Sequence, residues 1–166
     1  MRGPRNEVRE FEERVVKISR VSKKTKGGNR IGFSALTVVG DRKGRVGMGL
    51  GKAPDVASAI RKGMKKARKN MVTISLKGTT IPHEVRIKKG AAKLLFKPAR
   101  PGTGIIAGGP VRIVVEVAGI KDIVSKILGT TNKASNVYAA IEALKILKLE
   151  DNKNRRPNKK SQPVKK

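Results

Sequence analysis

The sequence is poor in the residues that carry redox, metal-binding and stacking chemistry. It contains no cysteine and no tryptophan, one tyrosine and three phenylalanines. The absence of cysteine excludes disulfides and cysteine-based metal or redox sites, and it is typical of a cytosolic protein. So few aromatic rings cannot form a platform that stacks successive bases of a single nucleic-acid strand.

Long hydrophobic runs are also missing. No apolar run approaches the ~20 residues that a membrane-spanning helix needs. The amino-terminal segment MRGPRNEVREFEE lacks the apolar core of a signal sequence. We therefore expect neither a membrane partner nor a secretory leader.

Acidic residues are the scarce charged class. The chain has 40 lysines and arginines against 12 aspartates and glutamates, a formal net charge of +28, and no acid within residues 14–40, 56–83 or 85–115. Such a chain repels itself strongly unless a polyanion neutralises it. Because aromatic residues are few, the pattern predicts folded or double-helical RNA, recognised through its backbone and shape.

The first half of the chain has a pattern of three strands and a helix. The run RVVKISRV (residues 14–21) predicts a half-buried strand, and a flexible cationic finger of residues 20–30 follows it. The segment RIGFSALTVVGDRKGRVGMGL predicts a hairpin that turns at residues 40–44. In its return strand Gly47, Gly49 and Gly51 leave one face without side chains, so another element must approach that face closely.

The segment APDVASAIRKGMKKARKNM predicts a helix with Pro54 in its first turn and Asp55 near its positive end. The spacing predicts an apolar stripe of Val56, Ile60, Met64, Ala67 and Met71. The remaining surface is cationic: Arg61, Lys62, Lys65, Lys66, Arg68 and Lys69. A solvated face is the plain interpretation. Because no acid interleaves to form i,i+4 pairs, we favour a surface that faces RNA.

The second half begins after SLKGTT. Two strands are expected, in IPHEVRIKKG and in AKLLFKPA, and then a glycine-rich loop, RPGTGIIAGGP. VRIVVEVAGI is β-branched like a strand but also has helical spacing, and KDIVSKILG fits a short strand or helix. ASNVYAAIEALKIL predicts a helix with one apolar side, formed by Val137, Ala140, Ile141, Leu144 and Leu147. From Lys153 onward the chain is basic, which predicts a disordered tail.

The segments that resemble motifs for small-molecule binding or catalysis lack residues that those motifs require. GMGLGK precedes a predicted helix, but Val46 stands where the Walker pattern needs its first glycine, and Ala53 stands where it needs a serine or threonine. The dinucleotide fingerprint fails because only cations lie where its acid belongs. His83, the sole histidine, lacks partners for catalysis or metal binding and is interpreted as structural. The loop GTGIIAGG is either an anion-binding nest or a site of close packing.

Several segments together resemble the bacterial form of ribosomal protein S-five of the small subunit. They are VSKKTKGGNR, FSALTVVGDRKGRVGMGLGKAPDVASAIRKGMKKARKNM, GTTIPHEV, KPARPGTGIIAGGPVR and VAGIKDIVSKILGTTN. The resemblance covers about residues 14–147. The chain departs from many relatives at Ile31, where they have a phenylalanine, in the turn TNKASN and in its basic carboxyl end.

This resemblance implies an α+β fold. It implies an arm over residues 1–13, a double-stranded-RNA-binding-like βββα domain over residues 14–76, and an α/β domain with a left-handed βαβ crossover over residues 77–150. Residues 151–166 remain as a basic tail that is disordered away from the ribosome. It further implies that GGPVRIVVEVAG is a helix, against its strand propensity.

The resemblance also implies a function: a non-enzymatic structural constituent of the small ribosomal subunit that binds its rRNA, helps assembly and influences accuracy. The implied partners are rRNA, ribosomal proteins S-four and S-eight, and nearby mRNA, with no cofactor, metal or small-molecule substrate. The residues expected to bind rRNA are Arg20, Ser22, Lys23, Lys24, Lys26, Gly27, Gly28, Asn29, Arg30, Lys52, Lys65 and Arg68. Those expected at a protein interface linked to accuracy are Gly102, Thr103, Gly104, Gly108, Gly109 and Arg112. The alternative is an RNA-binding or chaperone protein that acts away from the ribosome.

Overall fold

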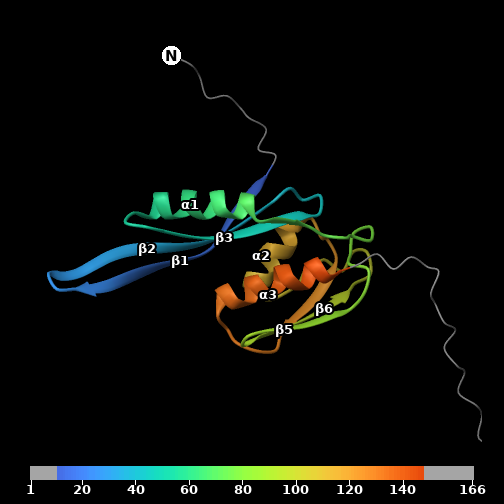
Figure 1. Cartoon of the computed structure of the whole chain (residues 1–166). Helices are drawn as coiled ribbons and strands as arrows, with labels where there is room; N and C mark the ends of the chain where they lie inside the picture. The colour runs from blue at the N-terminus through green and yellow to red at the C-terminus, as the bar shows by residue number, and fades with distance from the viewer. Residues whose placement is uncertain (1–10, 148–166) are drawn as a thin grey trace, which may run out of the picture.

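The computed structural model describes residues 11–147. The tail predicted over residues 151–166 and most of the arm predicted over residues 1–13 lie outside these residues. The amino-terminal half forms an antiparallel sheet of β1 (Glu12–Thr25), β2 (Gly28–Gly40), β3 (Arg45–Ala53) and β4 (Met71–Thr73), in that order. One helix, α1 (Val56–Lys69), lies on this sheet (Figure 1). The predicted hairpin and helix are confirmed, and β4 is a strand that the sequence pattern did not predict.

The carboxyl-terminal half forms a mixed sheet. Its strands are β5 (Val85–Lys89), β6 (Ala92–Pro98), β7 (Ile105–Ile106) and β8 (Ile123–Ile127), paired in the order β5-β6-β8-β7. Helices α2 (Gly109–Ala118) and α3 (Lys133–Ile146) complete it. The two-residue strand β7 runs parallel to β8 and is joined to it through α2, a βαβ unit. The glycine-rich loop therefore contains a short strand, and KDIVSKILG is a strand.

The β-branched segment VRIVVEVAGI is a helix, as the resemblance implied. Helix α2 begins after Gly108 with a proline in its first turn, and it ends at Gly119, whose φ of 91° is left-handed. Both end signals are typical of helices. Its valines Val111, Val114, Val115 and Val117 are fully buried. Tertiary packing around the whole helix thus outweighs the strand propensity of valine.

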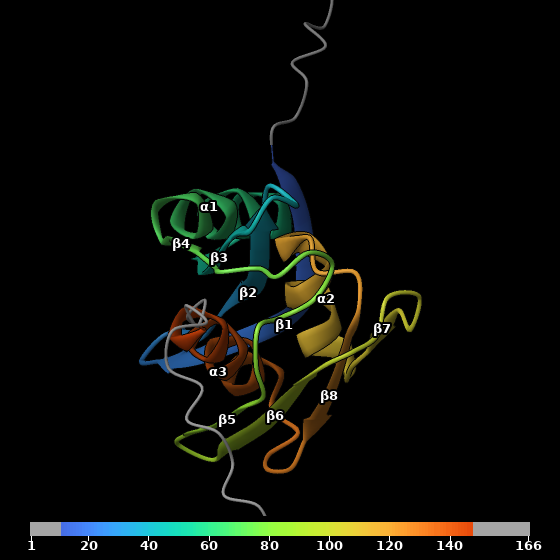
Figure 2. The same cartoon turned by 90° about the vertical axis from the view of Figure 1, so that its right-hand side faces the viewer.

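The molecule has four layers. From one side to the other they are α1, the amino-terminal sheet, the pair α2 and α3, and the carboxyl-terminal sheet (Figure 2). The main hydrophobic core lies between the two sheets, and it joins Val38 and Val46 of the first sheet to α2, α3 and Phe96 of the second. A small separate cluster of Ala35, Ala53 and Ala59 packs α1 on the outer side of the first sheet. Because the core is continuous, the predicted division at residue 76 is not visible as a break in packing, and the division stays a prediction. The double-stranded-RNA-binding-like fold and the handedness of the crossover also stay predictions.

The glycine face of β3 is covered by α1. This confirms the prediction that another element approaches that face closely. A Cβ atom built on Gly49 would lie 2.1 Å from the carbonyl oxygen of Gly63, and the corresponding distances at Gly47 and Gly51 are 2.2 Å and 2.0 Å. Real Cβ atoms do not approach other atoms so closely. The helix backbone therefore rests directly on the strand.

The fully buried face of α1 shares only Ala67 with the predicted stripe. The fully buried residues are Ala59, Gly63 and Ala67, whereas Val56, Ile60 and Met64 are only partly buried. Because the helix backbone touches the strand, only small side chains fit between them. The predicted place of Pro54 was also wrong: the helix starts at Val56, and the Asp55 side chain caps it by accepting a hydrogen bond from the Ser58 amide at 2.8 Å.

Candidate RNA-binding surface

The finger is a β-hairpin and not the flexible loop that its glycines suggested. Strands β1 and β2 stay paired out to Thr25 and Gly28, so only Lys26 and Gly27 form the turn. The Thr25 hydroxyl donates to the Gly28 carbonyl oxygen at 2.8 Å, and the φ of 124° at Gly28 requires glycine. Figure 1 shows this hairpin, residues 20–30, projecting away from the body of the protein.

Cations occupy both faces of the finger. Paired residues of an antiparallel ladder point to the same face, and successive residues alternate between faces. Lys23 therefore shares a face with its partner Arg30, whereas Lys24 lies opposite Asn29 on the other face. All residues from Arg20 to Ile31 are exposed. The predicted residues of the finger thus form a preformed cationic rod, with no acid among them.

A second cationic surface lies between α1 and α3. Lys62, Lys65, Lys66 and Lys69 follow one another at helical spacing, so they share one face of α1. They line a groove of about 1070 Å³, which we call the lysine groove. Residues of β3 form its floor, and residues of α3 form its opposite wall.

The lysine groove contains two of the predicted rRNA-binding residues, Lys52 and Lys65. Lys62, Lys66 and Lys69 also line it; they belong to the helix surface predicted to face RNA but were not listed as rRNA-binding residues, and Lys89 was not predicted at all. The helical spacing of α1 was the sequence signal that places Lys62, Lys66 and Lys69 on one face. Lys89 lies on β5, and no local pattern connects it to α1.

Arg68 points away from the lysine groove. Its Nη2 donates to Glu13 Oε1 at 2.7 Å, which ties α1 to the start of β1. Both side chains are partly exposed, so the ion pair adds little to stability. It does neutralise Arg68, in contrast to the lysines on the groove side of the same helix.

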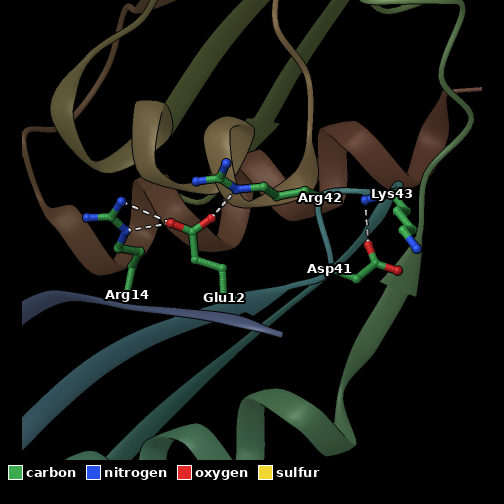
Figure 3. Close-up of polar contacts among 5 residues, drawn as sticks. All are labelled: Glu12, Arg14, Asp41, Arg42 and Lys43. Atoms are coloured by element: carbon green, nitrogen blue, oxygen red, sulfur yellow. Dashed lines mark hydrogen bonds and ion pairs between the residues drawn. The ribbon is translucent and has the colours of Figure 1, made fainter. Parts of the chain in front are cut away.

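The acids of the described residues are mostly held by the protein itself. Glu12 accepts hydrogen bonds from Arg42 and Arg14 (Figure 3), which lower its pKa. At Asp41 burial raises the pKa, but hydrogen bonds from Arg45 and from the Lys43 amide outweigh it and the pKa falls. Hydrogen bonds and ion pairs likewise engage Glu13, Asp55, Glu84, Asp122 and Glu142. These acids are therefore not free to neutralise the finger.

The glycine-rich loop is organised by one buried carboxylate. Asp122, only 4% exposed, accepts hydrogen bonds at Oδ1 from the Gly102 amide at 3.0 Å and the Gly104 amide at 2.9 Å. The pKa of Asp122 is lowered most by the hydrogen bond from the Gly104 amide, next by one with the Thr79 side chain, and also by the one from the Gly102 amide. Gly102 and Gly104 have φ values of 89° and 77°. This part of the loop is thus an anion nest, occupied by the protein's own carboxylate.

The other residues predicted at the protein interface lie around this loop. The Thr103 hydroxyl donates to the Arg100 carbonyl oxygen, at the exposed tip of the loop. Gly108 precedes α2, where a Cβ would lie 2.6 Å from Ile127 Cδ1, whereas Gly109 has open space around it. Arg112 is exposed on the first turns of α2. The predicted set thus lies along one continuous stretch of chain, from the exposed loop tip through β7 to the first turns of α2.

The small-molecule motifs have structural explanations. GMGLGK belongs to strand β3 and not to a loop before a helix, so it is no phosphate loop. His83 Nδ1 lies 3.0 Å from its neighbour's carbonyl oxygen. Residues 11–147 contain no group of three metal-ligating side chains, and no helix in this range is long and apolar enough to cross a membrane.

An α+β body with a cationic hairpin and a lysine groove defines an RNA-binding protein of the class that docks onto a phosphate backbone. Comparison with protein families supports this class and makes it specific. Residues 11–75 match the family described as ribosomal protein S5, N-terminal domain, and residues 87–155 match ribosomal protein S5, C-terminal domain. The chain belongs to the ribosomal protein S5 family. Its members are structural, rRNA-binding constituents of the small ribosomal subunit in the cytoplasm, and they are not enzymes.

Proposed function

We propose that this chain binds small-subunit rRNA chiefly through the finger and the lysine groove, and that this binding helps the subunit to assemble. The finger carries the proposal. It is a paired, exposed β-ribbon with cations on both faces and no acid. Because its backbone is already ordered, little conformational entropy is lost when it meets RNA.

The loop at residues 102–109 and Arg112 form the second part of the proposal. This segment contacts ribosomal protein S-four, a second surface meets S-eight, and the protein lies near the path by which mRNA enters. The interface with S-four influences decoding accuracy. The structure supports this in one respect: the loop is exposed at Thr103 yet held rigidly by Asp122, as a protein interface requires.

Salt dependence of RNA binding tests the first part. The affinity of the full chain for a small-subunit rRNA fragment is measured across a series of salt concentrations. A variant has Lys23, Lys24, Lys26 and Arg30 replaced by glutamine. In this variant the negative slope of log K against log salt should become shallower, by about one for each phosphate that is no longer neutralised. The fold should be unchanged because these side chains are exposed.

A matched control removes the same charge elsewhere. Lys77, Lys88, Lys93 and Lys126 lie in the carboxyl-terminal half, away from the finger and the lysine groove, and their replacement by glutamine should change the slope less. Equal slopes for the two variants would mean that only net charge matters, and the finger would lose its assigned role. Incorporation of both variants into small subunits, followed by a high-salt wash, separates a ribosomal constituent from a peripheral chaperone.

A further inference from the structure

The lysine groove has two walls of different chemistry. On the α1 side the wall is cationic. On the α3 side Tyr138, Ile141 and Glu142 follow one another at helical spacing, so they share one face. Tyr138 is 45% exposed there. Glu142 is bound to Lys89 at 2.6 Å, so the acid that lines the groove is already paired.

The floor of the groove is an open sheet edge. Strand β4 pairs with β3 only at Arg45, Val46 and Gly47. From Met48 to Ala53, no strand within residues 11–147 pairs with that edge of β3. Met48 and Leu50 line the groove at this edge and give it an apolar floor.

We propose that the lysine groove binds a short unpaired stretch of RNA, with a base stacked on Tyr138 and its phosphates directed to the lysines of α1. This inference rests on the proposed function, because it takes RNA as the ligand. It adds that this part of the RNA is single-stranded. An aromatic ring stacks on any exposed base, and lysines bind the phosphates in either case.

The geometry favours unpaired nucleotides over a duplex. In a duplex each base face is covered by its neighbours, so Tyr138 would have nothing on which to stack. A volume of about 1070 Å³ slightly exceeds the roughly 300–1,000 Å³ typical of pockets for small ligands. The groove thus has room for more than one nucleotide. A single ring does not form a platform for successive bases, so the stretch need only expose one base.

An acidic peptide is the other ligand that the lysines and the open edge would fit. It would use the charge of α1 and the backbone of β3, but it would gain nothing specific from Tyr138. The exposed aromatic ring opposite the lysines therefore favours RNA. A peptide is treated as an outcome of the test.

Intrinsic fluorescence provides the test, because Tyr138 is the only tyrosine and the chain has no tryptophan. Emission of the full chain, corrected for RNA absorbance, is titrated with three probes: a short unpaired oligoribonucleotide, an abasic ribose-phosphate oligomer of equal length, and a poly-glutamate peptide. Stacking quenches tyrosine emission, so the oligoribonucleotide should quench and the other two should not. Equal quenching by all three, or quenching by none, overturns the proposal. A response to poly-glutamate alone identifies a peptide site and also overturns it.

Variants give an independent measurement. The probes are an RNA hairpin with a fully paired stem and the same hairpin with a short single-stranded extension. The extension should increase the affinity of the wild-type chain for the hairpin. Tyr138→Leu should lower the affinity for the extended hairpin about tenfold. Tyr138→Phe should keep that affinity, because the ring remains. Leu128→Ala, at another exposed apolar residue, is the control and should change nothing.

The outcomes separate the two proposals. If the hairpin binds and the finger variant weakens it, but the extension adds no affinity, then only the groove proposal fails. If the paired hairpin does not bind at all, the proposed function fails first. If Tyr138→Leu and Tyr138→Phe lose the same affinity, the ring does not stack on a base, and the proposal is overturned.

Discussion

Gly49 of β3 and Gly63 of α1 are in backbone contact, with 2.1 Å between a Cβ built on Gly49 and the Gly63 carbonyl oxygen. This contact sets how closely α1 lies on the sheet, and hence where the lysines of its groove-facing side stand relative to α3. The positions of the cations thus depend on two residues that have no side chains.

Gly49→Ala should therefore destabilise the protein. The added methyl group meets helix backbone and not a flexible side chain, so α1 must move, at a cost of about 1–3 kcal/mol. Denaturant unfolding of the full chain measures the loss. Gly27→Ala is the matched control, because a Cβ there would have no atom within 4 Å. Equal unfolding midpoints for the two variants would contradict the close contact.

Asp122→Asn should make the protein less stable at neutral pH by removing a charge that accepts two loop amides. The pKa of Asp122 lies below its ordinary value of 3.8. A lowered pKa contributes stability that is present above the unfolded pKa and is lost as pH falls through the folded pKa. The difference in free energy of unfolding between wild type and Asp122→Asn should thus be constant above pH ~5 and shrink below pH ~4. A difference that stays constant down to pH ~2 would show that the carboxylate charge does not stabilise the loop.

Lys65 and Arg68 should contribute unequally to RNA binding, although both were predicted to bind rRNA. Arg68 is paired with Glu13, whereas Lys65 lines the groove. Lys65→Gln should make the slope of log K against log salt shallower by about one, and Arg68→Gln should change it by less. Glu13→Gln should in turn strengthen binding, because it releases Arg68. An Arg68→Gln effect as large as that of Lys65→Gln would show that RNA displaces Glu13.

Local patterns predicted those parts of the fold in which neighbouring residues carry the signal. The alternation of glycine and apolar residues at 46–51 predicted both the strand β3 and its covered face. The apolar side of α3 was also predicted, since Val137, Ala140 and Leu144 are all buried. The finger was misjudged because its strand pairing continues through exposed cations, and an exposed ladder leaves no apolar alternation to find.

The parts that could not be predicted depend on residues far apart in the chain. Asp122 organises glycines that lie 18 and 20 residues before it, and no spacing rule links a carboxylate to those amides. The lysine groove joins α1 to α3, whose lining residues are separated by the whole second sheet. The composition did predict its charge, but only the packing of α3 beneath the sheet places Tyr138 opposite the lysines.

Decoding accuracy tests the role of the glycine-rich loop. Gly104→Leu forces a side chain into a φ of 77°, and a Cβ there meets no atom within 4 Å, so the new side chain points into open space where a partner would lie. Arg112→Leu changes an exposed side chain nearby. If the proposed interface with S-four has two states, a change of ~1.4 kcal/mol in their balance shifts it about tenfold. Both variants should therefore alter stop-codon readthrough in ribosomes that contain them, while subunit yield stays normal.

Gly90→Leu is the matched control, because Gly90 also has a positive φ and open space, but lies in the turn between β5 and β6. Backbone strain alone would act equally at both glycines, so readthrough that changes for Gly104→Leu and Arg112→Leu but not for Gly90→Leu assigns the effect to the interface. Wild-type readthrough in all three variants, with normal assembly, would leave the loop with a packing role only.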